Sequence, residues 1–267
     1  PFQYADPGAG RVLGGGPVMS IQLNDVHRTF GQNHVLRGLN LEVLDGETLC
    51  IIGFSGAGKS VILKHMVGLI QPDSGDVLVD GQNVSDLDVG ELNELRRDIG
   101  YVFQFAALFD SMNIAENVAM GLRRMPDMYD DEIMARVSEC LALVDLEGTE
   151  DRYPSELSGG MVKRAGLARA IATRPTYLLY DEPTTGLDPV TVTVIDRLIV
   201  RMKEELGVTG VVITHDIASA YRISDRIVML HEGRIRTSGT IDEIKESRDP
   251  LLRSFLEGRP ELAERAS

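Results

Sequence analysis

"GFSGAGKS", residues 53–60, is the stretch that decides the fold of this chain. It matches the pattern G-x-x-x-x-G-K-[ST] at every fixed position, and chance would produce such a match in a chain of this length only about 1% of the time. The apolar run 49–52 before it predicts a parallel strand buried on both faces. From Lys59 onward, apolar residues recur at helical spacing as far as Leu69. Strand, glycine-rich turn and helix together predict an α/β fold with an anion-binding site.

This loop predicts specific contacts with a nucleotide. Its backbone N–H groups and the positive end of the following helix point at the phosphates. Lys59 reaches the β- and γ-phosphates, and the Ser60 hydroxyl binds Mg²⁺. The alternative, a glycine-rich turn before an ordinary helix, is disfavoured by the strand and helix around it. The loop residues that we predict to bind ATP are Gly53, Ser55, Gly56, Ala57, Gly58, Lys59, Ser60 and Val61.

Composition excludes some classes of function. The 267 residues include 27 basic and 41 acidic side chains, a net charge of −14, which argues against a nucleic-acid-binding surface. The two cysteines, Cys50 and Cys140, lack metal-ligand spacing, and we interpret both as reduced residues of a cytosolic protein. No window offers the roughly 18 apolar residues of a membrane span.

Along the chain, the pattern predicts three regions of structure. Residues 20–43 alternate apolar and polar side chains, which is typical of antiparallel strands, and Asp80-Gly81 predicts a hairpin within 75–84. Short apolar runs predict strands at 99–103, 177–180 and 211–213, and Glu232-Gly233 predicts another hairpin. Helices are expected over 113–123, 130–144, 189–206, 241–246 and 251–257. The result is an α/β core, an N-terminal antiparallel sheet and a helical insert across about 105–160.

Three further stretches carry polar residues suited to ATP hydrolysis. "YLLYDE" (177–182) is an apolar strand that ends in two carboxylates, and we expect the pleat to place them on opposite sides. Asp181 can then hold Mg²⁺ through water, while Glu182 faces the attacking water as general base. "LSGGM" (157–161) precedes a helix, and Ser158 and Gly160 can donate to an anion there. "ITHD" places His215 at a strand end, where its imidazole can contact the γ-phosphate.

In this order, the motifs resemble those of the ATP-binding-cassette (ABC) ATPases over about residues 20–239. The resemblance implies that Gln104 in "VFQ" is the Q-loop glutamine and a Mg²⁺ ligand, and that Phe30 stacks on adenine. It implies further nucleotide contacts at Ser158, Gly159 and Gly160 of the signature and at Asp188 of the D-loop, with Glu182, His215 and Lys59 as catalytic residues. Met161 stands where many relatives have Gln, and Phe30 where many have Tyr.

The same resemblance implies the architecture: a P-loop ABC nucleotide-binding domain with a RecA-like parallel-sheet core, an N-terminal antiparallel β subdomain and an inserted α-helical subdomain. We assign this domain to residues 19–248. Residues 1–18, rich in Gly and Pro, are expected to be a flexible leader or an artificial remnant, and 249–267 a C-terminal amphipathic helix and tail. The chain has one nucleotide loop but two anion-binding helix N-termini. In this family the signature of one subunit covers the ATP of the other, which implies a functional dimer.

The amino-acid sequences of some segments make the resemblance more specific and indicate one subfamily. "ALFDSMNIAENVA", "PSELSGGMVKRAGLARAIA" and "DPLLRSFLEGRP" look like the ATPases of Mla/Mkl-type systems, which move phospholipids between membranes. This implies a transmembrane permease, an MCE-domain protein and a small soluble accessory protein as partners, at the cytoplasmic face of the inner membrane. The insert opens with an apolar stretch that fits a groove for the permease. Its apolar residues are Phe105, Ala106, Ala107, Leu108, Phe109, Met112 and Ile114.

Other classes share part of this pattern. The ATPase of a generic importer for polar solutes has every catalytic motif. A soluble cassette protein of DNA maintenance or translation would usually carry a long coiled-coil insert or two cassettes, and neither is present here. A small-molecule kinase could use the same phosphate loop, but it would leave "LSGGM" and His215 unexplained.

The C-terminal run "RDPLLRSFLEGRP" predicts a short helix with Asp249 as its cap, Pro250 in its first turn and Gly258 at its end. Its apolar residues share one face, and a helix of this length must bury that face to be stable. Two alternatives stay open: the face packs on the chain's own core, or it docks a neighbouring subunit. The residues of the face are Leu251, Leu252, Phe255 and Leu256.

Overall fold

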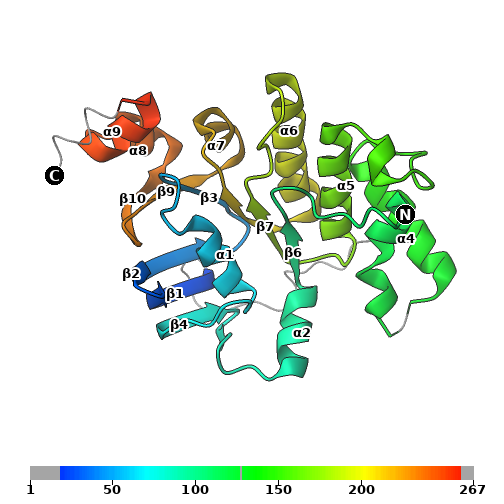
Figure 1. The fold of residues 1–267 in the computed structure, drawn as a ribbon, viewed down its shortest axis with the longest axis horizontal. Helices are drawn as coiled ribbons and strands as arrows, with labels where there is room; N and C mark the ends of the chain where they lie inside the picture. The colour runs from blue at the N-terminus through cyan, green and yellow to red at the C-terminus, as the bar shows by residue number, and fades with distance from the viewer. Residues whose placement is uncertain (1–18, 127, 260–267) are drawn as a thin grey trace.

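The computed structural model describes residues 19–126 and 128–259, which form two sheets with helices packed around them (Figure 1). The four-stranded sheet has the order β2-β1-β4-β5, and the six-stranded sheet has the order β10-β9-β3-β8-β7-β6. The predicted leader at 1–18 and the tail at 260–267 lie outside the described residues. The predicted α/β class is confirmed.

The smaller sheet is antiparallel, as the alternating pattern predicts. Its inward-facing side chains, such as Ile21 and Leu23, are fully buried. Asp80 and Gly81 both have positive φ angles, 51° and 77°, which is the backbone of a tight hairpin turn. The strands are β1 (Met19–Phe30), β2 (Asn33–Leu44), β4 (Ser74–Val79) and β5 (Gln82–Asn83).

The larger sheet is parallel except for its edge strand β10. Every residue of β3 and of β8 is buried, as the continuous apolar runs predict. Because the strands from β6 to β9 run the same way, their carboxyl ends meet at one edge of the sheet. The strands are β3 (Thr48–Ile52), β6 (Ile99–Val102), β7 (Tyr177–Asp181), β8 (Thr209–Ile213), β9 (Arg226–His231) and β10 (Arg234–Thr240).

Most of the expected helices are present, but the one expected over 113–123 is divided into an α-helix and a 3-10 turn, and the helices Val89–Arg97 and Ile217–Ile223 were not expected. The helix over 189–206 has the predicted bounds: Asp188 accepts hydrogen bonds from its first N–H groups, and Gly207 (φ 65°) ends it. The α-helices are α1 (Lys59–Met66), α2 (Val89–Arg97), α3 (Ile114–Ala119), α4 (Asp130–Leu143), α5 (Gly159–Ile171), α6 (Pro189–Leu206), α7 (Ile217–Ile223), α8 (Ile241–Glu246) and α9 (Pro250–Glu257). Short 3-10 turns span Leu122–Arg124 and Pro154–Glu156.

The helix after the phosphate loop is shorter than its apolar periodicity indicates. It ends at Met66, and Gly68 (φ 62°) then turns the chain, with the N–H of Leu69 bonded back to Lys64 O at 2.8 Å. Leu69 is 57% exposed, so its place in the predicted stripe is wrong. A glycine in the left-handed region ends a helix whatever the side-chain pattern beyond it.

The helical insert lies at one end of the molecule, around α4, while α8 and α9 lie at the opposite end (Figure 1). Its core includes the buried residues Ile114, Val118, Val137 and Leu141. The apolar stretch that opens the insert divides: Ala106 and Ile114 are buried, whereas Phe105 is 77% exposed and Phe109 is 47% exposed. Part of the stretch is therefore core and part is surface.

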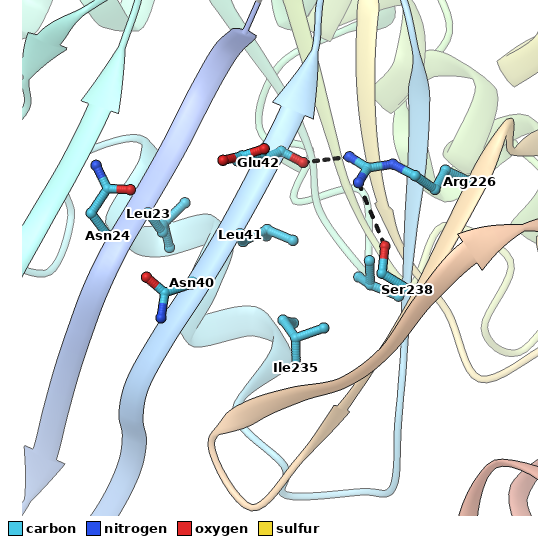
Figure 2. Close-up of a pocket in the computed structure, with 9 residues that line it drawn as sticks. Leu23, Asn24, Asn40, Leu41, Glu42, Arg226, Ile235 and Ser238 are labelled. Atoms are coloured by element: carbon cyan, nitrogen blue, oxygen red, sulfur yellow. Dashed lines mark hydrogen bonds between the residues drawn. The ribbon is translucent and has the colours of Figure 1, made fainter. Parts of the chain in front are cut away.

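A hollow of about 230 Å³ lies between the two sheets (Figure 2). Arg226 lines it and donates hydrogen bonds to the carbonyl of Glu42 and to Ser238 Oγ, and it also pairs with Glu47 at 2.7 Å. These contacts use the polar groups of the hollow to join the two sheets.

Elsewhere, Cys50 and Cys140 are buried free thiols, and burial raises the pKa of Cys140 to about 11. Among the described residues, no helix is long and apolar enough to cross a bilayer.

Candidate ATP-binding and catalytic site

A cavity of about 690 Å³ opens where the carboxyl ends of β3, β7 and β8 meet the first turn of α1. Predicted residues that line it are Gly53, Ser55, Gly56, Gly58, Lys59, Ser60, Val61, Glu182 and His215. Three lining residues were not predicted: Val35, Phe54 and Phe255. Phosphate loop and catalytic carboxylate thus face one space, although the sequence separates them widely.

The phosphate loop leaves the start of α1 open to a ligand. Gly58 precedes the helix in a left-handed conformation (φ 101°), and no side chain caps the first N–H groups. A Cβ on Gly58 would lie 2.7 Å from Val35 Cγ1, so this position has no room for a side chain. Uncapped N–H groups at the positive end of a helix form an anion site. This is the geometry that the motif predicts.

The side chain of Lys59 folds back into the phosphate loop that precedes it in the chain. Its side chain is 7% exposed, and its Nζ donates to the carbonyls of Gly53 at 2.9 Å and Phe54 at 3.1 Å. Burial lowers the pKa of Lys59, while the carboxylates of Glu182 and Asp181 oppose that shift. An ammonium has three donors, so one remains for a phosphate oxygen.

Ser60 and Asp181, which were each predicted to bind Mg²⁺, are in contact. Ser60 Oγ donates to Asp181 Oδ1 at 2.8 Å, although the two residues are 121 positions apart. Mg²⁺ prefers oxygen ligands and is usually held by one or two protein groups together with substrate phosphates, so this pair fits the ion. Among the described residues no group of three or more His, Cys, Asp or Glu could hold a metal, and three such ligands are not needed here.

Tyr101 is a neighbour of this pair that sequence reasoning missed. Its hydroxyl donates to Asp181 Oδ2 at 3.2 Å. Burial raises the pKa of Tyr101, so the hydroxyl stays protonated and remains a donor. Asp181 therefore has one oxygen directed to Ser60 and the other to Tyr101.

Glu182 reaches its place by a different route from the predicted one. Strand β7 ends at Asp181, and Glu182 has a left-handed backbone (φ 48°), so the pleat does not orient its side chain. From the sequence, we expect the pleat of one strand to separate the two carboxylates. That reason is wrong, because only Asp181 belongs to the strand. The turn directs Glu182 to its own neighbours: Thr185 Oγ1 donates to it at 2.9 Å, and His215 Nδ1 lies 3.3 Å from it.

Gln104 joins the same group from the end of β6. Its Nε2 donates to Glu182 Oε2 at 3.4 Å, so Gln104 contacts the residue that we predict to be the general base. Its role as a Mg²⁺ ligand stays a prediction. Thr185 and Lys163 had no sequence signal: a threonine in a turn and a lysine within a helix are common on any surface.

Helix α5 holds the Q-loop segment from behind. Lys163, only 8% exposed, donates to the carbonyl of Gln104, and burial lowers the pKa of this lysine. Arg169 donates to the carbonyls of Ala106 at 2.5 Å and Ala107 at 2.6 Å. Both alanines have positive φ angles, 58° and 51°, which L-residues rarely adopt. The helix therefore stabilises a strained turn that directly follows Gln104 in the chain.

The remaining predicted residues do not line this cavity. Ser158 and Gly159 are exposed at the start of α5, where Ser158 Oγ accepts a hydrogen bond from Met161 N at 3.4 Å. Asp188 caps α6, and hydrogen bonds from Thr191 lower its pKa. The others outside the lining are Phe30, at the end of β1 with the Arg28 guanidinium 4.7 Å from its ring centre, and Ala57, Gln104, Gly160 and Asp181.

The sequence of the chain is similar to those of a family and of several known proteins. The profile described as "ABC transporter" matches residues 36–185. The chain is 42% identical to Protein TRIGALACTOSYLDIACYLGLYCEROL 3, chloroplastic, of Arabidopsis thaliana, over 89% of this chain and 73% of that protein. It is 39% identical to the probable ribonucleotide transport ATP-binding protein mkl of Mycobacterium tuberculosis, over 90% and 67%. It is also 42% identical to the methionine import ATP-binding protein MetN of Xylella fastidiosa, over 88% and 72%.

Solved structures give the same fold. The dimeric post-hydrolysis state of the ATP-binding cassette MJ0796, bound to ADP and Pi, superposes with a TM-score of 0.75 at 35% identity, over 83% of this chain and 98% of that one. A cassette of the transporter complex cbiONQ from Clostridium perfringens superposes with a TM-score of 0.79 at 30% identity, over 92% and 98%.

Proposed function

Because this chain belongs to the ABC transporter family and carries its ATPase domain, we propose that it powers phospholipid transport between membranes together with an MCE-domain protein. The observation that carries the lipid assignment is the 42% identity to a plant protein named for a galactolipid, over 89% of this chain. The Mla/Mkl-type wording of the signature and C-terminal segments points the same way.

The ATPase mechanism follows from the residues around the cavity. The uncapped start of α1 and Lys59 bind the phosphates, and Ser60 and Asp181 would hold Mg²⁺, which neutralises charge on the phosphates when it is bound. Glu182 is the general base for the attacking water. His215, at 3.3 Å, and Gln104, at 3.4 Å, orient its carboxylate.

The second anion-binding helix needs a second subunit. Ser158 and Gly159 are exposed and lie outside the lining of their own cavity, so they are free to meet a nucleotide held elsewhere. We infer that they cover the ATP of a second copy, and that Asp188 and Phe30 also contact nucleotide as predicted. Dimeric cassettes among the similar solved structures support this arrangement.

Three exposed aromatic residues near Gln104 in the sequence, here called the aromatic cluster, fit the surface that meets the permease. Phe103 (41% exposed) precedes Gln104, and Phe105 and Phe109 follow it. Exposed apolar clusters of this kind mark interaction sites. We infer that a permease segment docks on this aromatic cluster, which would place the chain on the cytoplasmic face of the membrane and connect transport with the Q-loop. A small soluble accessory protein completes the proposed assembly.

The experiment is affinity purification of the tagged chain from detergent-extracted membranes. We expect a permease and an MCE-domain protein in the eluate. Phe105→Glu should remove both, whereas Val89→Glu, at a position of α2 that is 78% exposed, should retain them. Each variant must keep the melting temperature of the wild type.

A second candidate is the ATPase of an importer for polar solutes, because the methionine and sulfate/thiosulfate import proteins are about as similar to this chain. Recovery of a solute permease without an MCE-domain protein would support that candidate and contradict ours.

A further inference from the structure

The C-terminal helix α9 is anchored to the core by its leucines. Leu252 is fully buried and Leu251 nearly so, in a cluster with residues of β3, β9 and α7. Asp249 caps the helix by accepting a hydrogen bond from Leu252 N at 2.9 Å, and it pairs with Arg236 of β10 at 2.9 Å. For this part of its apolar face, the alternative in which α9 packs on the chain's own core is the one observed.

Phe255 extends this face into the cavity. It is half-buried against the same core cluster, and its ring also lines the cavity where ATP is proposed to bind. Its ring meets that of Phe54, the second residue of the phosphate loop, edge to face, with centroids 5.2 Å apart and planes at 85°. His231 of β9 makes a second edge contact with Phe54 at 6.2 Å. A helix outside the ATPase motifs thus contacts the loop that binds phosphate.

The backbone of Phe54 carries this contact to the catalytic lysine. Phe54 O accepts hydrogen bonds from Lys59 Nζ at 3.1 Å and from Ala57 N at 3.2 Å, the turn of the loop itself. Phe54 is 38% exposed, and Phe255 and His231 are its edge-to-face ring neighbours. A loop that is ordered before the nucleotide arrives does not have to lose that freedom on binding, and the affinity is higher for it.

We propose that Phe255 is a positioning residue of the ATPase site: its ring holds Phe54, and so the phosphate loop and Lys59, in the conformation that binds nucleotide. The inference rests on the proposed nucleotide site in this cavity. It assigns to α9 control over nucleotide affinity rather than over the chemical step, because the ring contact of Phe255 is with Phe54 of the phosphate loop.

The test is the equilibrium binding of a fluorescent ATP analogue to the full chain, measured in the presence of Mg²⁺. Phe255→Ala and Phe255→Leu should each weaken binding by about 3- to 10-fold, the size of one lost aromatic pair. KM for ATP should rise by the same factor while kcat stays unchanged. Phe255→Tyr, which keeps the ring, should bind as the wild type does.

Leu256→Ala is the matched control, because Leu256 packs on the same core cluster without lining the cavity. It should lower the melting temperature and leave the affinity unchanged. Phe54→Ala should weaken binding at least as much as Phe255→Ala, because it also removes the contact with His231, and the double variant should bind no more weakly than Phe54→Ala alone.

Three outcomes overturn parts of this picture separately. If Phe255→Leu binds the analogue with unchanged affinity while Lys59→Ala does not bind it, the role of Phe255 is contradicted and the proposed nucleotide site is not. No binding of the analogue to the wild-type chain contradicts the site itself. A lower melting temperature with normal affinity in Phe255→Ala would make α9 a purely structural helix.

Discussion

The starts of α1 and α5 are built on the same principle and differ in what surrounds them. Both helices follow a glycine-rich or small-residue turn, but α1 begins without a side-chain cap, inside a cavity shared with Lys59 and Glu182. Helix α5 begins with Ser158 as its own cap, and Ser158 and Gly159 face outward. We therefore interpret the start of α1 as the proposed phosphate site within one chain, and the start of α5 as a surface proposed to meet the nucleotide of a second subunit.

The two starts are also connected within the chain. Lys163, less than two turns into α5, donates to the carbonyl of Gln104, and Gln104 contacts Glu182. A movement of α5 would therefore reach the proposed base through two hydrogen bonds. The predictions below test how unequal the two helix starts are and how strongly they are connected.

The largest expected effect is on the proposed phosphate site. Glu182→Gln should lower ATP hydrolysis by about 10²- to 10⁴-fold, because it removes the base and leaves the phosphate donors in place. Phosphate release measures the rate, and binding of a fluorescent ATP analogue should be unchanged. A rate near that of the wild type would show that Glu182 is not the base.

The next effect concerns the outward-facing helix start. Ser158→Arg should block hydrolysis without weakening nucleotide binding to the same chain's loop, whereas Lys59→Ala should lose binding. Mixed in equal amounts, the two inactive variants should regain about a quarter of the wild-type rate, because half of the dimers are mixed and each mixed dimer keeps one intact site. No recovery on mixing, or a rate in the Ser158→Arg variant equal to the wild type, would contradict an in-trans role.

The smallest effect tests the connection between the two starts. Lys163→Met keeps most of the side-chain volume and removes the donor to Gln104 O, so kcat should fall by about 2- to 5-fold with KM unchanged. Arg164→Met is the control, because the neighbouring Arg164 donates to the carbonyls of Val144 and Asp145 instead. Steady-state kinetics with equal effects of both substitutions would mean that Lys163 acts only through the stability of α5.

Local signals in the sequence were sufficient for most of the secondary structure. The helix expected over 189–206 matches α6 in its bounds, and Asp80-Gly81 located its hairpin. Where prediction was wrong, one backbone angle outweighed the side-chain pattern. Gly68 ended α1 before Leu69, and the left-handed Glu182 left the pleat of β7.

By itself, the sequence determined which residues can bind phosphate and which can act as base, because these depend on residue type and on spacing over a few positions. Only the tertiary structure decided which other residues surround them. Tyr101 beside Asp181, Lys163 beside Gln104 and Phe255 beside Phe54 join elements far apart in the chain. Such contacts depend on how strands and helices pack against one another, and no short stretch of sequence carries that information.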